Sequence, residues 1–203
     1  MTNTLAKIFS YIFHPLLMPT YGMLLLFNTG TYLSFLPFEY QKLLYIIVFL
    51  ATFVLPVLMV PLFLYRNFIQ SMEMHQRNER FFPMIGTLIF YSAAYILFTK
   101  LPLPDAVKSY MLAVAVCVAL SLIITIKWKI STHMIGIGGI AGVLVALSII
   151  YSSNQLGYLA IILLISGFIG FSRLQLQAHT PAQVYAGFFL GFFVELITIV
   201  SFT

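Results

Sequence analysis

Residues 134–151 read MIGIGGIAGVLVALSIIY, an apolar run without a single charged side chain. A helix that crosses the hydrocarbon core of a bilayer needs about 20 apolar residues. The whole chain shares this character: it is 62% hydrophobic and 7% charged, whereas a soluble domain carries roughly a quarter charged residues. The sequence therefore predicts an all-α fold, a polytopic transmembrane helix bundle that forms one domain over residues 1–203.

Similar apolar runs recur along the chain and predict the membrane spans. They lie at 15–36, 43–65, 82–100, 109–126, 134–151, 157–171 and 183–202. Pro15 and Pro19 interrupt the first run, and the sixth is short. Six and seven spans are therefore both open at this point.

The basic residues are distributed unevenly between the two membrane faces that seven spans would define. The N-terminus and the loops 66–81, 127–133 and 172–182 would share one face. That face would hold seven of the ten basic residues, namely Lys7, Arg66, Arg77, Arg80, Lys127, Lys129 and Arg173. The positive-inside rule favours this face as cytoplasmic. Three of the seven are candidate site residues, however, so the orientation stays open.

Two glycine pairs indicate which helices pack together. Gly138 and Gly142 follow His133, and Gly187 and Gly191 follow His179. Small residues four positions apart let membrane helices approach closely. We expect these two helices to be neighbours, with both histidines at adjacent helix starts, although either motif alone is also typical of generic packing.

The starts of these two helices favour anion binding. Ser131 and Thr132 begin one of them. Thr180 begins the other, followed by Pro181 and by Gln183 in a capping-box pattern. Helix N-termini present unpaired N–H groups and the positive end of the helix dipole, which attract anions.

Cationic and titratable side chains stand beside these helix starts. Arg173 can hold a phosphate in a planar fork, and Lys129 acts as a point charge. His133 and His179 add imidazoles, which titrate near neutral pH and can act as nucleophiles. The sequence therefore predicts a phosphate site with a nucleophile and a proton donor.

Three short segments resemble signatures of the type 2 phosphatidic acid phosphatase-like family, which comprises membrane lipid phosphatases and related acid phosphatases. Segment 172–179 (SRLQLQAH) resembles the third signature, Ser-Arg-x5-His. Segment 129–133 (KISTH) is similar to the second, normally Pro-Ser-Gly-His, and segment 80–83 (RFFP) is a weak match to the first. The resemblance covers residues 66–200 and implies a phosphatase-like core.

The resemblance also implies roles for individual residues. His179 would be the nucleophile that becomes phosphohistidine, and His133 the general acid that protonates the leaving group. The phosphate oxygens would be bound by Arg173, Ser131 and either Arg80 or Lys129. The family has an aspartate four residues after the nucleophile, where this chain has Gln183. Glutamine can orient the imidazole by accepting its hydrogen bond, but it brings no charge.

The function implied is hydrolysis of a phosphate or pyrophosphate on a lipid drawn from the bilayer. Polyprenyl pyrophosphate, phosphatidic acid, phosphatidylglycerophosphate and a lipid A phosphate are candidate substrates. No cofactor, metal or nucleic-acid partner is expected, since four scattered histidines without an acid cluster form no metal-ligand set. We expect a multi-pass protein of the bacterial inner (cytoplasmic) membrane, and the oligomeric state is open.

Two other functions stay open. The first is a non-catalytic lipid-phosphate binder or carrier on the same scaffold. The second is a transporter that uses Glu195, the only acid inside a predicted span. We interpret His14 as a residue of the membrane interface, with an approach to the site as the alternative, and His75 as a solvated loop residue.

Overall fold

The structure is a computed structural model that describes residues 2–70 and 78–203. Within that part of the chain the regular elements are helices, and seven helical segments are long and apolar enough to cross a membrane. They are Asn3–Asn28, Phe38–Tyr65, Phe81–Lys100, Asp105–Thr125, Thr132–Tyr151, Leu156–Gln175 and Pro181–Phe202. The described residues thus confirm the all-α fold, with seven helices that could span a membrane, whereas His75 and Arg77 lie outside them.

The first span differs from the predicted 15–36 at both ends. It begins earlier, with α1 (Asn3–Ile12), and continues through a short 3-10 helix, η1 (Pro15–Leu17), into α2 (Met18–Asn28). Between α1 and η1 the backbone of His14 is extended, and its Nδ1 accepts a hydrogen bond from the N–H of Leu16 at 3.3 Å. Proline fits the first position of a helix because its missing N–H is not needed there. Pro15 therefore restarts the helix and produces a kink.

The second span contains a π-helical turn. It consists of α3 (Phe38–Phe49), the turn η3 (Leu50–Val54) and α4 (Leu55–Tyr65). Pro56 lacks the N–H that would bind the carbonyl of Thr52, four residues earlier. The hydroxyl of Tyr91 donates to that carbonyl instead, at 3.2 Å. A neighbouring helix thus satisfies the freed backbone group, as membrane proteins require.

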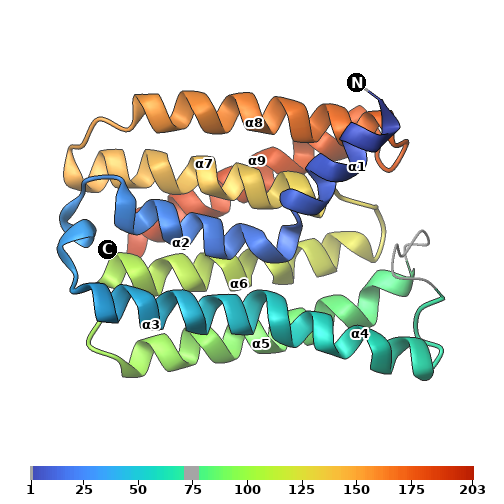
Figure 1. The fold of residues 1–203 in the computed structure, drawn as a ribbon, viewed down its shortest axis with the longest axis horizontal. Coiled ribbons are helices and arrows are strands. Elements are labelled where there is room, and N and C mark those ends of the chain that lie inside the picture. The colour runs from blue at the N-terminus through green and yellow to red at the C-terminus, as the bar shows by residue number, and fades with distance from the viewer. Residues whose placement is uncertain (1, 71–77) are drawn as a thin grey trace.

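The remaining spans are α5 (Phe81–Lys100), α6 (Asp105–Thr125), α7 (Thr132–Tyr151), α8 (Leu156–Gln175) and α9 (Pro181–Phe202). Figure 1 shows that α1 and the starts of α5, α7 and α9 lie at one end of the bundle. We call this the motif end. The C-terminus and the ends of α5 and α7 lie at the opposite end. This arrangement agrees with the alternation of faces expected for seven spans.

Helices α7 and α9 pack backbone to backbone, as the glycine pairs predict. A Cβ atom added to Gly187 would lie 2.6 Å from the carbonyl oxygen of Ser131, and one added to Gly191 would collide with that of Ile135. Gly138 and Gly142 meet the carbonyls of Phe188 and Phe192 in the same way. Only glycine permits this separation, so the four glycines fix the register of the two helices.

Candidate functional site

A cavity of about 280 Å³ lies inside the bundle, and its wall carries most of the predicted site residues. Apolar side chains of α4, α5 and α6, such as Val60, Met84 and Val114, form much of this wall. The histidine, arginine and glutamate side chains on it come from separate elements: His14, Arg80, His133, Arg173, His179 and Glu195. Side chains from all three signature-like segments thus line one space.

His179 lies just before α9, and Gln183 holds its ring. The Nδ1 of His179 is 3.0 Å from the Oε1 of Gln183. The same oxygen accepts the backbone N–H of Thr180 at 3.2 Å, while the Thr180 hydroxyl caps the N–H of Gln183. This is the predicted capping box, and it fixes the orientation of the amide group. Because Oε1 can only accept, Nδ1 carries the proton, and the lone pair of the neutral ring is on Nε2.

Burial and nearby cations keep this imidazole neutral. His179 is 8% exposed, and its pKa is lowered to about 4, chiefly by burial. The hydrogen bond to Gln183 acts in the opposite direction, whereas the positive charges of Arg80, Arg173 and Lys129 contribute to the lowering. At neutral pH the ring therefore has an unprotonated Nε2, which is the form that a nucleophile requires.

Arg173 stands in the last turn of α8 and is held by the N-terminal helix. Its Nη1 donates a hydrogen bond to the Oγ of Ser10 at 3.0 Å, and that hydroxyl donates to the carbonyl of Ala6 at 2.9 Å. The Nε of Arg173 is buried and has no hydrogen-bond partner among the residues described. A half-buried guanidinium with an unused, buried donor can bind an anionic ligand at low cost.

Ser10 also positions the second histidine. The Nε2 of His133 lies 3.1 Å from the carbonyl oxygen of Ser10, so this nitrogen donates and Nδ1 is the one that can exchange a proton with a ligand. The ring of His14 packs edge-on against that of His133, with centroids 6.0 Å apart. His14 therefore belongs to the cavity wall, the alternative that the sequence left open.

The other predicted phosphate ligands have different positions. Ser131 is fully buried, its N–H donates to the carbonyl of Gln183 at 3.4 Å, and its neighbour Thr132 lines the cavity in its place. Arg80 lines the cavity at the start of α5, and its burial lowers its pKa. Lys129 is not on the wall, but burial and then the charges of Arg80 and Arg173 lower its pKa.

Sequence reasoning did not identify Ser10. It lies 163 residues before its partner Arg173 and belongs to a helix outside the predicted first span. The only available signal was a serine in an apolar N-terminal segment, which is common. For metal binding, residues 2–70 and 78–203 contain no cluster of three or more histidine, cysteine, aspartate or glutamate side chains.

No family model matches the chain, and neither a curated protein nor a solved structure is similar to it. The chemistry that the site could carry out is therefore inferred from its geometry alone. It combines a neutral imidazole with a free Nε2, a second imidazole and two guanidinium groups on the wall of one cavity. Such a set can bind an anion and exchange a proton with it.

Proposed function

We propose that this protein is a membrane phosphatase that hydrolyses a phosphate or pyrophosphate on a lipid through a phosphohistidine at His179. The observation that carries the proposal is the 3.0 Å contact between His179 Nδ1 and Gln183 Oε1. It leaves the lone pair of Nε2 available on a cavity whose wall also holds Arg80, Arg173 and His133.

In the first step, Nε2 of His179 attacks the phosphorus atom and the bond from phosphorus to the leaving lipid oxygen breaks. His133, which must carry a proton on Nδ1 as well as on Nε2 when the substrate is bound, gives the Nδ1 proton to that oxygen, so that the lipid departs as an alcohol, or as a monophosphate when the substrate is a pyrophosphate. Arg173 and Arg80 stabilise the negative charge of the transferred group. Guanidinium groups suit this role because they bind phosphate oxygens through paired N–H donors.

In the second step, water attacks the phosphohistidine. His133, which lost its proton in the first step, accepts one from the water. The bond between phosphorus and Nε2 breaks, inorganic phosphate leaves, and His179 returns to its neutral form. A histidine that exchanges protons in both directions is a general acid and then a general base.

The resemblance of segments 80–83, 129–133 and 172–179 to the type 2 phosphatidic acid phosphatase-like family supports the same reading. Each segment contributes a side chain to the cavity: Arg80, His133, and both Arg173 and His179. These segments belong to separate spans. If they resembled the family signatures only by chance, their side chains would not be expected to line the same cavity. Orientation of the nucleophile by Gln183 in place of an aspartate is the departure from the family pattern.

That departure favours one second candidate, a lipid-phosphate binder or carrier without catalysis. Gln183 supplies the geometry of an orienting residue without its negative charge, and in an analogous triad loss of that charge lowers the rate by about 10⁴. Binding requires only the cations of the cavity, whereas hydrolysis also requires an effective nucleophile. The two candidates therefore differ in whether phosphate is released.

The test is phosphate release by the purified protein in detergent, with lipid monophosphates and pyrophosphates as substrates. We expect release by the wild-type protein and its loss in His179→Ala. A phosphoprotein intermediate that is labile in acid and stable in base would identify the phosphohistidine. Lys42→Ala, which removes an exposed cation from α3, is the control and should release phosphate at the wild-type rate.

The possible outcomes separate the two candidates. Binding of the lipids without release of phosphate would establish the carrier and exclude the enzyme. Release that persists unchanged in His179→Ala would exclude His179 as the nucleophile, even if the protein is a phosphatase.

A further inference from the structure

The cavity has a second polar feature, which lies deeper in the bundle than the histidines. Glu195 of α9 is 3% exposed, and its carboxyl group lies on the cavity wall. Its Oε2 is buried and has no hydrogen-bond partner in the described part of the chain. A buried carboxyl oxygen without a partner is unfavourable in a bilayer, so its persistence calls for a ligand.

The register of α7 and α9 places this carboxyl group and shows that the fold makes room for it. Gly187 faces Ser131 and Gly191 faces Ile135, and the next step of four residues along both helices brings Glu195 to Gly139. A Cβ on Gly139 would lie 3.2 Å from the Cγ of Glu195. At this level the glycine is on α7 and the large side chain on α9, so the missing side chain of Gly139 leaves space for the carboxyl group.

The same register gives the depth of Glu195 below the motif end. His133 lies six residues before Gly139 on α7, which is ~9 Å along the helix axis at 1.5 Å per residue. Gln183 lies twelve residues before Glu195 on α9, which is ~18 Å. Apolar side chains, among them Val114, Val118 and Ile135, make up much of the wall of this cavity.

We propose that Glu195 is the inner end of a two-point binding site that takes an amphiphilic phosphate with a second polar group, a hydrogen-bond donor, on its apolar portion. This inference rests on the proposed function, because the cations at the motif end bind the phosphate. The apolar wall packs against the connecting hydrocarbon, and Glu195 binds a hydroxyl or an ammonium group ~9–18 Å deeper.

The hydrogen bonds made by the cavity wall near Glu195 indicate that the ligand carries a hydrogen-bond donor. The hydroxyl of Tyr110 already donates to the carbonyl of Pro19 at 2.6 Å, and that of Tyr91 donates to Thr52. The hydroxyl of Ser121 likewise donates to the carbonyl of Val118 at 2.9 Å. Their hydrogens are therefore committed to backbone groups, and none of these three hydroxyls donates to the unpartnered oxygen of Glu195.

The experiment compares three probes that differ only at the end remote from the phosphate. Octyl phosphate, 8-hydroxyoctyl phosphate and 8-aminooctyl phosphate are titrated calorimetrically into the full-length protein in lipid nanodiscs. We expect at least one of the two polar-ended probes to bind about tenfold more tightly than octyl phosphate, the gain from one hydrogen bond to a carboxyl group. Homologous probes with 6, 10 and 12 carbons locate the best length.

Two variants assign the gain to the carboxyl group. In Glu195→Leu all three probes should bind alike, because the partner of the polar end is lost. In Glu195→Gln the preference for the ammonium should disappear while that for the hydroxyl remains, because an amide oxygen still accepts a hydrogen bond. Both variants remove a buried carboxyl group, so we expect their thermal unfolding midpoints to be at least as high as that of the wild type.

The outcomes separate this inference from the proposed function. Equal affinity for the three probes in the wild type, or a gain that survives in Glu195→Leu, would overturn the role of Glu195. Arg173→Ala should weaken all three probes by a common factor and leave their ratios unchanged. If no phosphate probe binds at all, the proposed function fails, and octylamine then tests Glu195 alone: loss of its binding in Glu195→Leu supports the inner site, and no binding to the wild type refutes it.

Discussion

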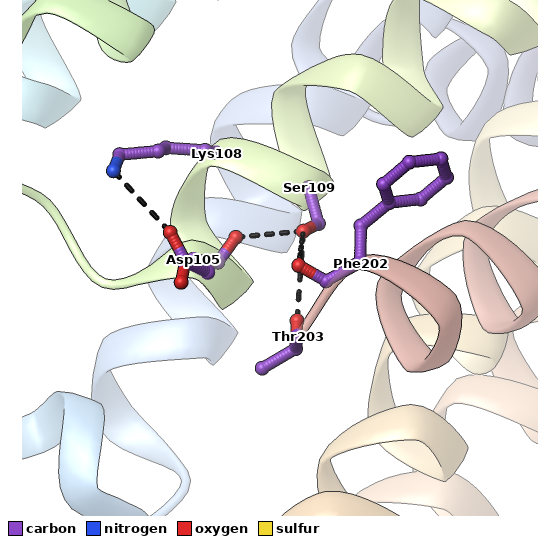
Figure 2. A network of polar contacts seen from close by, with 5 residues as sticks. All are labelled: Asp105, Lys108, Ser109, Phe202 and Thr203. Atoms are coloured by element: carbon purple, nitrogen blue, oxygen red, sulfur yellow. Dashed lines mark hydrogen bonds and ion pairs between the residues drawn. The ribbon is translucent and has the colours of Figure 1, made fainter.

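The polar groups at the two ends of the bundle differ in their contacts: at one end they bind one another, and at the motif end they surround a cavity. At the opposite end, Figure 2 shows polar groups that bind one another: Lys108 pairs with Asp105 at 3.3 Å, and the Ser109 hydroxyl contacts the carbonyl of Asp105 at 2.7 Å. That hydroxyl also reaches the carbonyl of Phe202 at 3.3 Å and the hydroxyl of Thr203 at 3.5 Å. These contacts tie the start of α6 to the last residues of α9.

At the motif end the polar groups surround a cavity. Arg173 and His133 use one nitrogen each to bind Ser10, and His179 uses one to bind Gln183. The contacts orient the rings and the guanidinium group while other nitrogens stay available. Polar groups that close on each other stabilise a fold, whereas polar groups held around a cavity can bind a ligand. The following substitutions test this difference.

The largest effect, on stability, is expected at the close contact between α7 and α9, which holds the starts of these two helices side by side at the motif end. Gly191→Ala places a methyl group against the carbonyl of Ile135 and 2.8 Å from the backbone nitrogen of Gly139. Backbone atoms cannot move aside, so we expect the free energy of unfolding to fall by ~3 kcal/mol or more, the upper part of the range for overpacking. Thermal unfolding in detergent measures it.

Gly167→Ala on α8 is the matched control, because a Cβ there would meet nothing within 4 Å. It should be neutral or stabilise the protein by up to ~1 kcal/mol, since alanine is the better helix former. Equal unfolding midpoints for the two variants would show that α7 and α9 do not pack as described.

The second effect concerns the cations. Arg173→Ala removes a guanidinium from the cavity wall, and we expect the rate of phosphate release to fall ~100-fold, or ~3 kcal/mol, the scale of a charge-assisted contact with phosphate. Lys100→Ala removes an exposed cation from the opposite end of the bundle and should leave the rate unchanged. A similar fall of the rate in both variants would mean that phosphate release depends on the net charge of the protein and not on a cation at the cavity wall.

The third effect concerns the orienting residue. Gln183→Glu keeps the length and the capping oxygen of the side chain but adds a negative charge, which raises the pKa of His179 above about 4. Protonation blocks Nε2, so activity is present above this pKa and lost as the pH falls through it. The variant should therefore move the acid limb of the pH–rate profile upward by about one pH unit, ~1.4 kcal/mol, and raise the neutral-pH rate about tenfold.

Gln175→Glu adds the same charge at the same end of the bundle, on a side chain whose contact is with Asn3. It should leave both the rate and the acid limb in place. An acid limb that does not move in Gln183→Glu would contradict the pairing of Gln183 with the nucleophile.

The smallest effect is expected at the opposite end. The side chains of Lys108 and Asp105 are 28% and 68% exposed, and exposed ion pairs contribute at most ~1 kcal/mol. Lys108→Ala should change the free energy of unfolding by no more than ~0.5 kcal/mol and leave phosphate release intact. A larger loss of stability would show that the polar contacts of Figure 2 matter more than their exposure indicates.

Much of this architecture follows from patterns that are local in sequence. Apolar runs indicate spans because any helix in a bilayer must be apolar over its length. The glycines of α7 and α9 recur within single helices, and the capping box of Thr180 and Gln183 spans four residues. The first span escaped this reasoning because His14 and Pro15 end one helix and start another within a few residues.

The sequence by itself therefore determined the class of fold, the common end of the three signature-like segments and the α7–α9 pair. Only the tertiary structure decided which side chains meet there. It placed Ser10 between Arg173 and His133, put Thr132 on the cavity wall in place of Ser131, and aimed Glu195 into the cavity. The physical reason is that these contacts depend on the rotation of each helix about its own axis. Packing across the bundle sets that rotation. Because the helices are apolar on nearly every face, the sequence has no hydrophobic periodicity from which the rotation could be predicted.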